Sequence, residues 1–146
     1  MATYRARYVG FPNAIKPPFV LLGESFGTCR YWHGRVMTRW ARDWTRLWTE
    51  GGGTFAMSDM EDQGFADALS RLGQMGRVDF KRVLFLRTGS NYCMQAPKQD
   101  VNESLQDGYA GYIPSLEAAY RVGSKVLHEL TGNWAKYRDH IPGPST

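Results

Sequence analysis

Bulky apolar residues, mostly tryptophans, recur at every fourth position within residues 31–48, and this spacing constrains the fold more than any other feature. At about 100° per residue, the bulky apolar side chains share one face of a helix. The arginines of the stretch fall on the opposite face, where a solvated surface is a better interpretation than a phosphate-binding one. A chain with 5 Trp, 8 Tyr and 7 Phe must bury many of these rings or place them against something flat. The apolar face consists of Trp32, Val36, Trp40, Trp44 and Trp48, and the basic face of Arg35, Arg39, Arg42 and Arg46.

Short apolar runs alternate with helical patterns along the chain. Strands are expected at 19–22, 54–57 and 82–87, and helices at 31–48, at 62–72 and from about residue 114 onward. This order is typical of an α/β fold with three short strands alternating with three helices around a mostly parallel sheet. Residues 1–18 are expected to form an irregular N-terminal segment, and residues 90–106 a polar loop. Because three strands make a thin sheet with an unpaired edge, we expect the chain to be part of a larger domain or to pair with another chain.

Composition argues against several classes of protein. The net charge of +4 is weak evidence for a nucleic-acid partner, and none is expected. No apolar stretch approaches the roughly 20 residues of a membrane-spanning helix, and the N-terminus lacks the apolar core of a signal peptide. A soluble protein is therefore expected, with no indication of its compartment. The 2 cysteines are expected to be free thiols, and the 3 histidines have no metal-ligand spacing, so no metal is expected.

A motif typical of serine hydrolases follows the first predicted strand. Residues 23–27 read G-E-S-F-G, the G-x-S-x-G pattern in which a sharp turn exposes a nucleophilic serine, here Ser25. Acid and base partners follow in the right order, for example Asp107 and His128. Only 18 residues precede the strand, too few for the upstream sheet and oxyanion loop of that fold. A tight glycine-containing turn is therefore favoured, and the hydrolase stays as the alternative.

Polar side chains also stand where the predicted strands end, which is where open α/β sheets bind ligands. The carboxylates of Asp59 and Glu61 can accept hydrogen bonds from neighbouring hydroxyls, and Met60 can pack under a sugar ring. Asn91 offers an acceptor and a donor together, which suits the edge of a purine. Each also has a structural explanation, since acids are favoured at helix N-termini and asparagine is common in turns. The segments concerned are 23–32, 58–61 and 88–92.

The order of several short motifs resembles the C-terminal part of the purine nucleoside permease family, a branch of the nucleoside phosphorylase superfamily. The resemblance covers nearly all of the chain after Pro17. Members of the family are much longer on the N-terminal side, so a fragment is expected, with residues 19–146 forming the C-terminal half of a nucleoside phosphorylase-like domain. The matching stretches are Tyr31-Trp32-His33-Gly34, Trp44, Leu47-Trp48-Thr49-Glu50-Gly51, Met60-Glu61-Asp62, Leu86-Arg87-Thr88, Ser90-Asn91-Tyr92, Glu103-Ser104-Leu105, Leu116 to Ser124, Asn133-Trp134 and Ile141-Pro142-Gly143.

The resemblance implies a site for the sugar of a nucleoside. The Met-Glu pair of phosphorylases holds the ribose, which places Met60 under the sugar and Glu61 on its hydroxyls. Asp59 stands just before that pair and is expected to assist. The chain has Glu24-Ser25 where the family tends toward Asp-Thr, a mild departure.

The resemblance also implies a site for the base. The aromatic residue after the first strand stacks on the base in phosphorylases, which suggests Tyr31, with Trp32 as the other candidate. Ser90 and Asn91 correspond to the segment that meets the purine edge. Many bacterial phosphorylases have Asp at the position of Asn91, and an amide is not a comparable proton donor. Asn91 is nevertheless the best candidate for a catalytic contact, through hydrogen bonds to purine N7 or a 6-oxo group.

Purine nucleoside binding, linked to nucleoside uptake or metabolism, is therefore the expected function. The glycine-rich phosphate loop of the superfamily belongs to its N-terminal portion and has no counterpart in this sequence. The intact parent is expected to be a phosphorylase or nucleosidase, with phosphate as a co-substrate and no other cofactor, and this chain alone to be inactive. The expected partners are a purine nucleoside and either a second copy or the missing N-terminal half. An inactive truncated remnant is a further alternative to the hydrolase.

Overall fold

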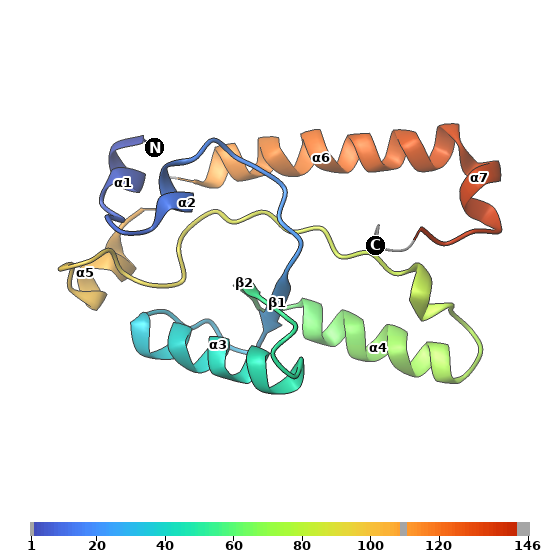
Figure 1. The fold of residues 1–146 in the computed structure, drawn as a ribbon, viewed down its shortest axis with the longest axis horizontal. Coiled ribbons are helices and arrows are strands. Elements are labelled where there is room, and N and C mark those ends of the chain that lie inside the picture. Colours follow the sequence, from blue (N-terminus) through green and yellow to red (C-terminus); the bar gives the residue numbers. More distant parts are fainter. Residues whose placement is uncertain (1, 109–110, 143–146) are drawn as a thin grey trace.

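A computed structural model describes residues 2–108 and 111–142 of the chain (Figure 1). This part of the chain combines helices with one small parallel sheet, so it is a mixed α/β structure. The nucleoside phosphorylase-like fold implied by the resemblance stays a prediction. The elements are α1 (Ala2–Ala6), α2 (Pro12–Ile15), β1 (Glu24–Gly27), α3 (Arg35–Trp48), β2 (Phe55–Asp59), α4 (Asp62–Gln74), the 3₁₀ turn η1 (Phe80–Arg82), α5 (Val101–Gln106), α6 (Tyr112–Gly132) and α7 (Trp134–Arg138).

A strand–helix–strand unit lies at the centre of the described structure. β1 and β2 pair in parallel, with Phe26 opposite Ser58 and Gly27 opposite Asp59, and α3 is the crossover between them. A Cβ at Gly23 would lie only 2.8 Å from the Cβ of Ala56, so the entry to β1 needs glycine for close approach. The unit aligns the carboxyl ends of both strands.

Two of the three predicted strands are wrong. Residues 19–22 and 82–87 form no strand; the second range begins in η1, and residues 83–87 run without secondary structure. The described sheet therefore has two strands, and one of them occupies residues 24–27, where a tight turn was favoured. Apolar runs mark residues suited to a buried strand, but a strand also needs a neighbour to share its backbone hydrogen bonds. The described residues supply that neighbour only for β1 and β2.

The predicted helices are confirmed, with small shifts at their ends. Helices α3 and α4 cover most of the ranges expected for them, and α6 begins at Tyr112, close to the expected start. Short helices also occur where none was expected. The irregular N-terminal segment contains α1 and α2, and the polar loop contains α5, whose first turn is capped by the Asp100 carboxylate. Such short helices depend on caps and tertiary contacts, which periodicity does not reveal.

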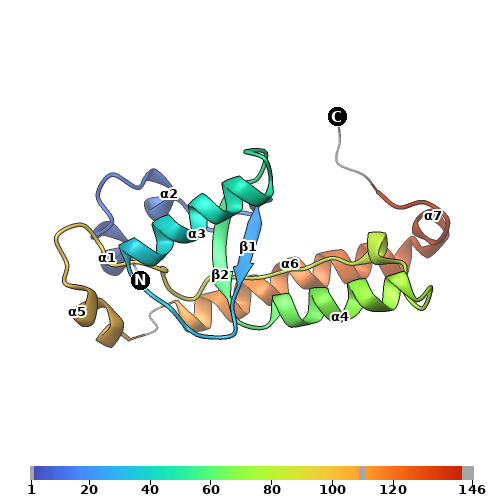
Figure 2. The same cartoon turned by 90° about the horizontal axis from the view of Figure 1, so that it is seen from below.

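The extended segment 83–89 lies between α6 and the layer that contains α4 and the sheet (Figures 1 and 2). The hydroxyl of Thr88 donates to the carbonyl of Ser115 in α6 at 3.0 Å. A Cβ at Gly123 in α6 would lie 3.6 Å from a methyl group of Leu86. The segment thus packs against α6 and makes no strand pairing.

Helix α3 buries only one margin of its apolar face. Thr38, Ala41 and Thr45 are buried, and both threonine hydroxyls donate to the carbonyls four residues earlier. Val36 and Trp48, in contrast, are 81% and 75% exposed. The sequence predicted the amphipathic helix correctly, but the described neighbours cover less of it than its tryptophans indicate.

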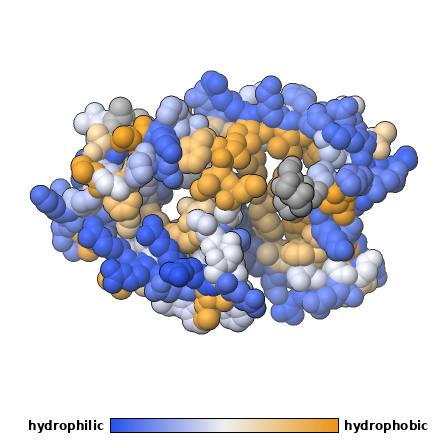
Figure 3. Space-filling model, in the orientation of Figure 1, coloured by the Kyte–Doolittle hydropathy of each residue, from blue (hydrophilic) through white to orange (hydrophobic). Residues whose placement is uncertain are grey.

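Exposed apolar side chains are also frequent elsewhere. The accessible surface is 11297 Å², whereas a compact monomer of 16.6 kDa is expected to expose about 7,600 Å². In the orientation of Figure 1, hydrophobic side chains gather around the hollowed centre of the molecule (Figure 3). Segments 19–22 and 84–86 and helix α6 border this centre in the ribbon (Figure 1), and we use the term central apolar face for their exposed side chains, those of Phe19, Val20, Leu21, Leu22, Leu84, Phe85, Leu86, Leu116 and Tyr120.

Candidate functional site

The carboxyl ends of β1 and β2 are joined through Asp59. Its carboxylate accepts hydrogen bonds from the hydroxyl of Ser25 and, at 2.9 Å, from the backbone N–H of Asp62. Its carbonyl accepts from the N–H of Thr28 at 3.0 Å. Asp59 therefore fixes the turn into α4 and the chain leaving β1. In this geometry its carboxylate already has two donors, so a ligand hydroxyl would have to share it.

Arg87 ties the extended segment 83–89 to the start of α4. Its Nε lies 2.8 and 2.9 Å from the two carboxylate oxygens of Asp62, and its Nη2 also donates to that carboxylate. Asp62 is buried, and the Arg87 guanidinium lies 3.9 Å from the more exposed carboxylate of Glu61. The hydrogen bonds to Asp62 raise the pKa of Arg87, with smaller contributions from the charges of Asp59 and Glu61.

This ion pair was missed by the sequence reasoning. Asp62 and Arg87 both fall within the motifs that carry the family resemblance, but neither was given a role. The available signal was an arginine at the end of an apolar run, which in a buried setting needs a carboxylate partner. The position of Asp62 in the first turn of a helix is explained by the helix dipole alone, so nothing in the sequence pointed to Asp62 as the partner.

Met60 and Glu61 are open to solvent beside this ion pair. Met60 is 45% exposed, and the side chain of Glu61 is 58% exposed. Because Arg87 reaches Glu61 only at 3.9 Å, the glutamate oxygens keep most of their capacity to accept hydrogen bonds. A hydroxylated ligand approaching this turn would meet an exposed carboxylate and an exposed thioether on consecutive residues.

Segment 88–91 continues from Arg87 toward the start of α6. A Cβ at Gly111 would overlap the carbonyl oxygen of Ser90, so glycine allows the two backbones to touch. The hydroxyl of Ser90 lies 3.4 Å from the side-chain oxygen of Asn91, and Asn91 itself is exposed. The side chain of Asn91 is thus exposed to solvent, and the backbone just before it packs closely against Gly111.

The loop before α3 lies against residues 93–95. The N–H of Gly34, three residues after Tyr31, donates at 2.9 Å to the carbonyl of Cys93, which is two residues after Asn91. Tyr31 is 54% exposed. The ring of Trp32 is half-buried and lies 6.3 Å from that of Phe55, which leaves Tyr31 as the more accessible aromatic face.

Two ring nitrogens in this loop are buried and have no hydrogen-bond partner among the described residues, Nε1 of Trp32 and Nδ1 of His33. The other nitrogen of His33 lies 3.1 Å from the hydroxyl of Ser104. Burial lowers the pKa of His33, so the imidazole is neutral at pH 7.

The three loops with predicted site residues are therefore connected. Arg87 links the Asp59–Glu61 turn to the segment that carries Asn91, and the bond from Gly34 to Cys93 links that segment to the Tyr31 loop. A separate surface hollow, between the end of α4 and η1, is lined by Ser70, Gly73, Gln74, Val78, Asp79, Phe80 and Lys81 and contains none of these residues. Among residues 2–108 and 111–142, no group of three His, Cys, Asp or Glu side chains could hold a metal ion.

The alternative hydrolase site finds no support in these contacts. The hydroxyl of Ser25 donates to Asp59. Asp107, in contrast, pairs with Arg7 at 3.1 Å and accepts from Gln99 at 2.7 Å. His128 is exposed on α6. The three residues of the hypothetical triad thus have other surroundings.

Comparisons with known proteins agree with the resemblance seen in the sequence. The chain is 29% identical to the purine nucleoside permease of Candida albicans over 122 residues, which are 82% of this chain and 30% of that protein. It is 26% identical to a protein of Schizosaccharomyces pombe named a probable purine nucleoside permease, over 92% of this chain and 38% of the relative. The chain thus spans about a third of the length of these relatives.

No solved structure matches the chain significantly. In the part of the chain that the structure describes, no helix combines the length and apolar character needed to cross a bilayer. The family model for purine nucleoside permeases matches residues 1–142, nearly the whole sequence. The chain therefore belongs to the purine nucleoside permease family.

Proposed function

We propose that this chain binds a purine nucleoside in the open angle between its three connected loops, as part of a nucleoside permease-like protein. The observation that carries the proposal is the pair of links described above, from Arg87 to the Asp59–Glu61 turn and from Gly34 to Cys93. They join a carboxylate, a thioether, an amide and an aromatic ring that come from separate parts of the sequence. The permease names of the relatives support a nucleoside as the ligand class.

In the proposed complex Glu61 accepts hydrogen bonds from the ribose hydroxyls, and Met60 packs under the sugar. Both side chains are exposed at the same edge. The guanidinium of Arg87 lies 3.9 Å from the Glu61 carboxylate, beyond hydrogen-bond distance, so the carboxylate oxygens can accept from the sugar hydroxyls. Asp59 assists by holding the turn rather than by direct contact, since its carboxylate already accepts from Ser25 and from the N–H of Asp62.

The base of the nucleoside is proposed to stack on Tyr31 and to meet Asn91 and Ser90 at its edge. A purine offers a face for stacking and adjacent acceptors and donors on its rim, which an exposed tyrosine and amide complement. Trp32 is a less suitable platform because its ring is half-buried near Phe55. Asn91 stabilises the base by hydrogen bonding, without donating a proton.

The second part of the proposal concerns the central apolar face. The accessible surface exceeds that of a compact monomer by about 3,700 Å², on the scale buried in obligate interfaces. The relatives are about three times as long as the region they share with this chain. The face is therefore proposed to pack against polypeptide corresponding to the rest of those proteins, rather than against a second copy. Phosphate binding and any cleavage of the nucleoside would belong to that larger assembly.

A fluorescence titration tests nucleoside binding. Inosine stacked near Trp32 should quench tryptophan emission in a saturable way. Glu61→Ala and Asn91→Ala should each weaken binding about tenfold or more, because each removes a polar contact with the ligand. Glu117→Ala and Asn102→Ala change the same residue types at exposed positions outside the three loops and should leave the affinity unchanged.

The same titration discriminates the alternatives. Unchanged affinity in both site variants would refute the assignment of the site. Absence of quenching, together with a near-UV circular dichroism spectrum that lacks tertiary structure, would indicate an inactive remnant. Labelling by a fluorophosphonate that disappears in Ser25→Ala would instead favour the hydrolase.

A further inference from the structure

The N-terminal segment packs against the residue that follows Asn91. The ring of Tyr92 lies 3.9 Å from that of Tyr8 and is stacked 6.0 Å from that of Tyr4. Its hydroxyl donates to the carbonyl of Ala14 in α2 at 3.3 Å. Tyr8, Ala14 and Ala96 form a hydrophobic cluster of buried residues, with Tyr4, Phe11 and Tyr92 packed around it. A segment expected to be irregular therefore helps to build a core next to the predicted base contact.

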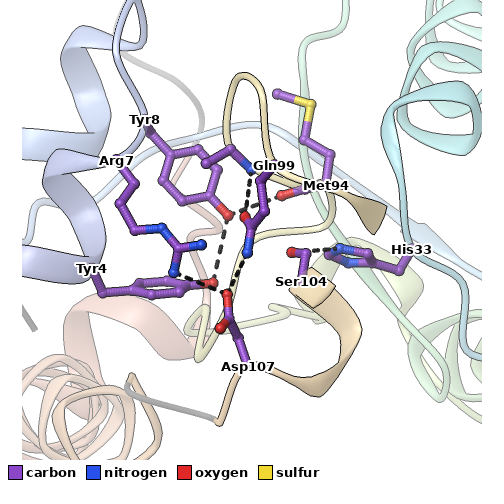
Figure 4. Close-up of polar contacts among 9 residues, drawn as sticks. Tyr4, Arg7, Tyr8, His33, Met94, Gln99, Ser104 and Asp107 are labelled. Carbon is purple, nitrogen blue, oxygen red and sulfur yellow. Dashed lines mark hydrogen bonds and ion pairs between the residues drawn. The ribbon is translucent and has the colours of Figure 1, made fainter. Parts of the chain in front are cut away.

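Tyr8 also fixes the backbone beyond Tyr92. Its side chain is buried, and its hydroxyl donates to the carbonyl of Met94 at 2.9 Å (Figure 4). Burial raises the pKa of the Tyr8 phenol, and a hydrogen bond with Tyr4 acts in the same direction. The phenol therefore keeps its proton at all physiological pH values and stays a donor to this carbonyl.

A second set of polar contacts closes the loop from the other side (Figure 4). Arg7 forms an ion pair with Asp107 at 3.1 Å, and Gln99 donates to the same carboxylate at 2.7 Å. The side-chain oxygen of Gln99 accepts from the N–H of Ala96 at 3.1 Å. The loop between Tyr92 and Asp107 is thus held at both ends by residues of the first turns of the chain.

The loop is held on its opposite side by the start of α3. The carbonyl of Cys93 accepts from the N–H of Gly34 at 2.9 Å and from the hydroxyl of Thr38 at 3.2 Å. Successive carbonyls, those of Cys93 and Met94, therefore bond to α3 and to Tyr8 respectively. Asn91 lies just before these two bonded carbonyls. On its N-terminal side, Arg87 is bonded to Asp62 and Thr88 to the carbonyl of Ser115.

We propose that residues 2–16 are a positioning element for base recognition, which acts through Tyr8 and Tyr92 to set the place of the Asn91 amide. The inference rests on the proposed function, since it gives these tyrosines a role in nucleoside binding. Tyr8 and Tyr92 are positioning residues and do not themselves touch the ligand. Removing their hydroxyls frees the loop and lets the exposed amide of Asn91 move away from the base.

Hydrogen exchange measured by NMR tests the structural half of this inference without any ligand. The amides of Ala96 and Gln99 donate within the loop, to the Gln99 side chain and the Ala96 carbonyl respectively. Tyr8→Phe and Tyr92→Phe keep the rings and lose the hydroxyl bonds, so these two amides should exchange faster while amides of α4 stay unchanged. Tyr120→Phe, on an exposed tyrosine of α6, is the matched control. Unchanged exchange in both variants would overturn the proposal.

A double-mutant cycle with inosine tests the functional half. Tyr8→Phe should weaken inosine binding roughly two- to tenfold, the change expected when one hydrogen bond is lost. In an Asn91→Ala background the same substitution should have little effect, because the amide it positions is gone. Equal effects in both backgrounds would mean that Tyr8 acts only on general stability and would overturn the positioning role. If the unaltered chain fails to bind inosine, the proposed function and with it the role in recognition fail, and the exchange data alone decide whether the N-terminal segment holds the loop.

Discussion

Replacing Arg87 by methionine should destabilise the chain more than the loss of a solvent-exposed ion pair does. The variant keeps the length of the aliphatic stem but leaves the Asp62 carboxylate without its bidentate partner. The side chain of Asp62 is only 9% exposed, so water reaches its oxygens poorly. Removing one partner of a fully buried pair costs about 3–5 kcal/mol. The side chain of Arg87 is 37% exposed, which lowers the expected loss to about 2–3 kcal/mol.

Urea unfolding followed by far-UV circular dichroism measures this loss. Arg121→Met is the matched control, because Arg121 pairs with Glu117 on the surface of α6 with side chains 75% and 58% exposed. Such a pair contributes about 0.3–0.5 kcal/mol. The double variant Arg87→Met/Asp62→Asn should lose less unfolding free energy than the two single variants lose together, since no uncompensated charge stays buried. Equal losses in Arg87→Met and Arg121→Met would refute the reasoning that the buried carboxylate sets the magnitude.

Three further predictions concern other parts of the chain. Gly111→Ala should lower the urea midpoint, because the added Cβ would overlap the carbonyl oxygen of Ser90. Gly64→Ala, with open space around the Cβ in α4, should instead raise stability by about 0.5–1 kcal/mol. Equal urea midpoints for the two variants would contradict this prediction. Burial holds the pKa of His33 below its ordinary 6.5, so the unfolded state binds the proton first as the pH falls. The stability contributed by neutral His33 is complete above about pH 6.5 and is lost as the pH falls below it. The urea midpoints at pH 7 and pH 5 should therefore differ less in His33→Gln than in the unaltered chain. The same difference in both proteins would argue against a buried neutral imidazole. The chain alone should bind the dye ANS strongly through its central apolar face, and fluorescence no higher than that of a compact control protein would show that the face is covered.

Helices were predictable from this sequence because their signal is local. The four-residue spacing of tryptophans, the glycines after Trp48 and the apolar spacing of α6 are properties of neighbouring residues. The strands were predicted less well. Residues 19–22 and 83–86 have the composition of buried strands but make no strand ladder, whereas residues 24–27, with the sequence Glu-Ser-Phe-Gly, do. Strand pairing depends on a partner distant in the sequence, so composition alone indicates only where a strand would be stable.

The candidate site divides in the same way. Asp59, Glu61 and Asn91 were predicted from residue type and from their place after apolar runs, and whether they bind a nucleoside stays a prediction. The ion pair between Asp62 and Arg87 became visible only when the chain was folded. So did the contact between Tyr8 and the Met94 carbonyl, because its partners are 86 residues apart.

The amino-acid sequence by itself determined the family, the three longest helices and the kinds of side chain available for binding, because these follow from local spacing and from motifs that persist along the chain. Only the tertiary structure decided which strands pair, that the N-terminal turns form a core with Tyr92, and that much of the tryptophan face stays open. The reason is physical: burial and backbone pairing are properties of surfaces in contact, and a sequence specifies what each surface prefers without stating which surfaces meet.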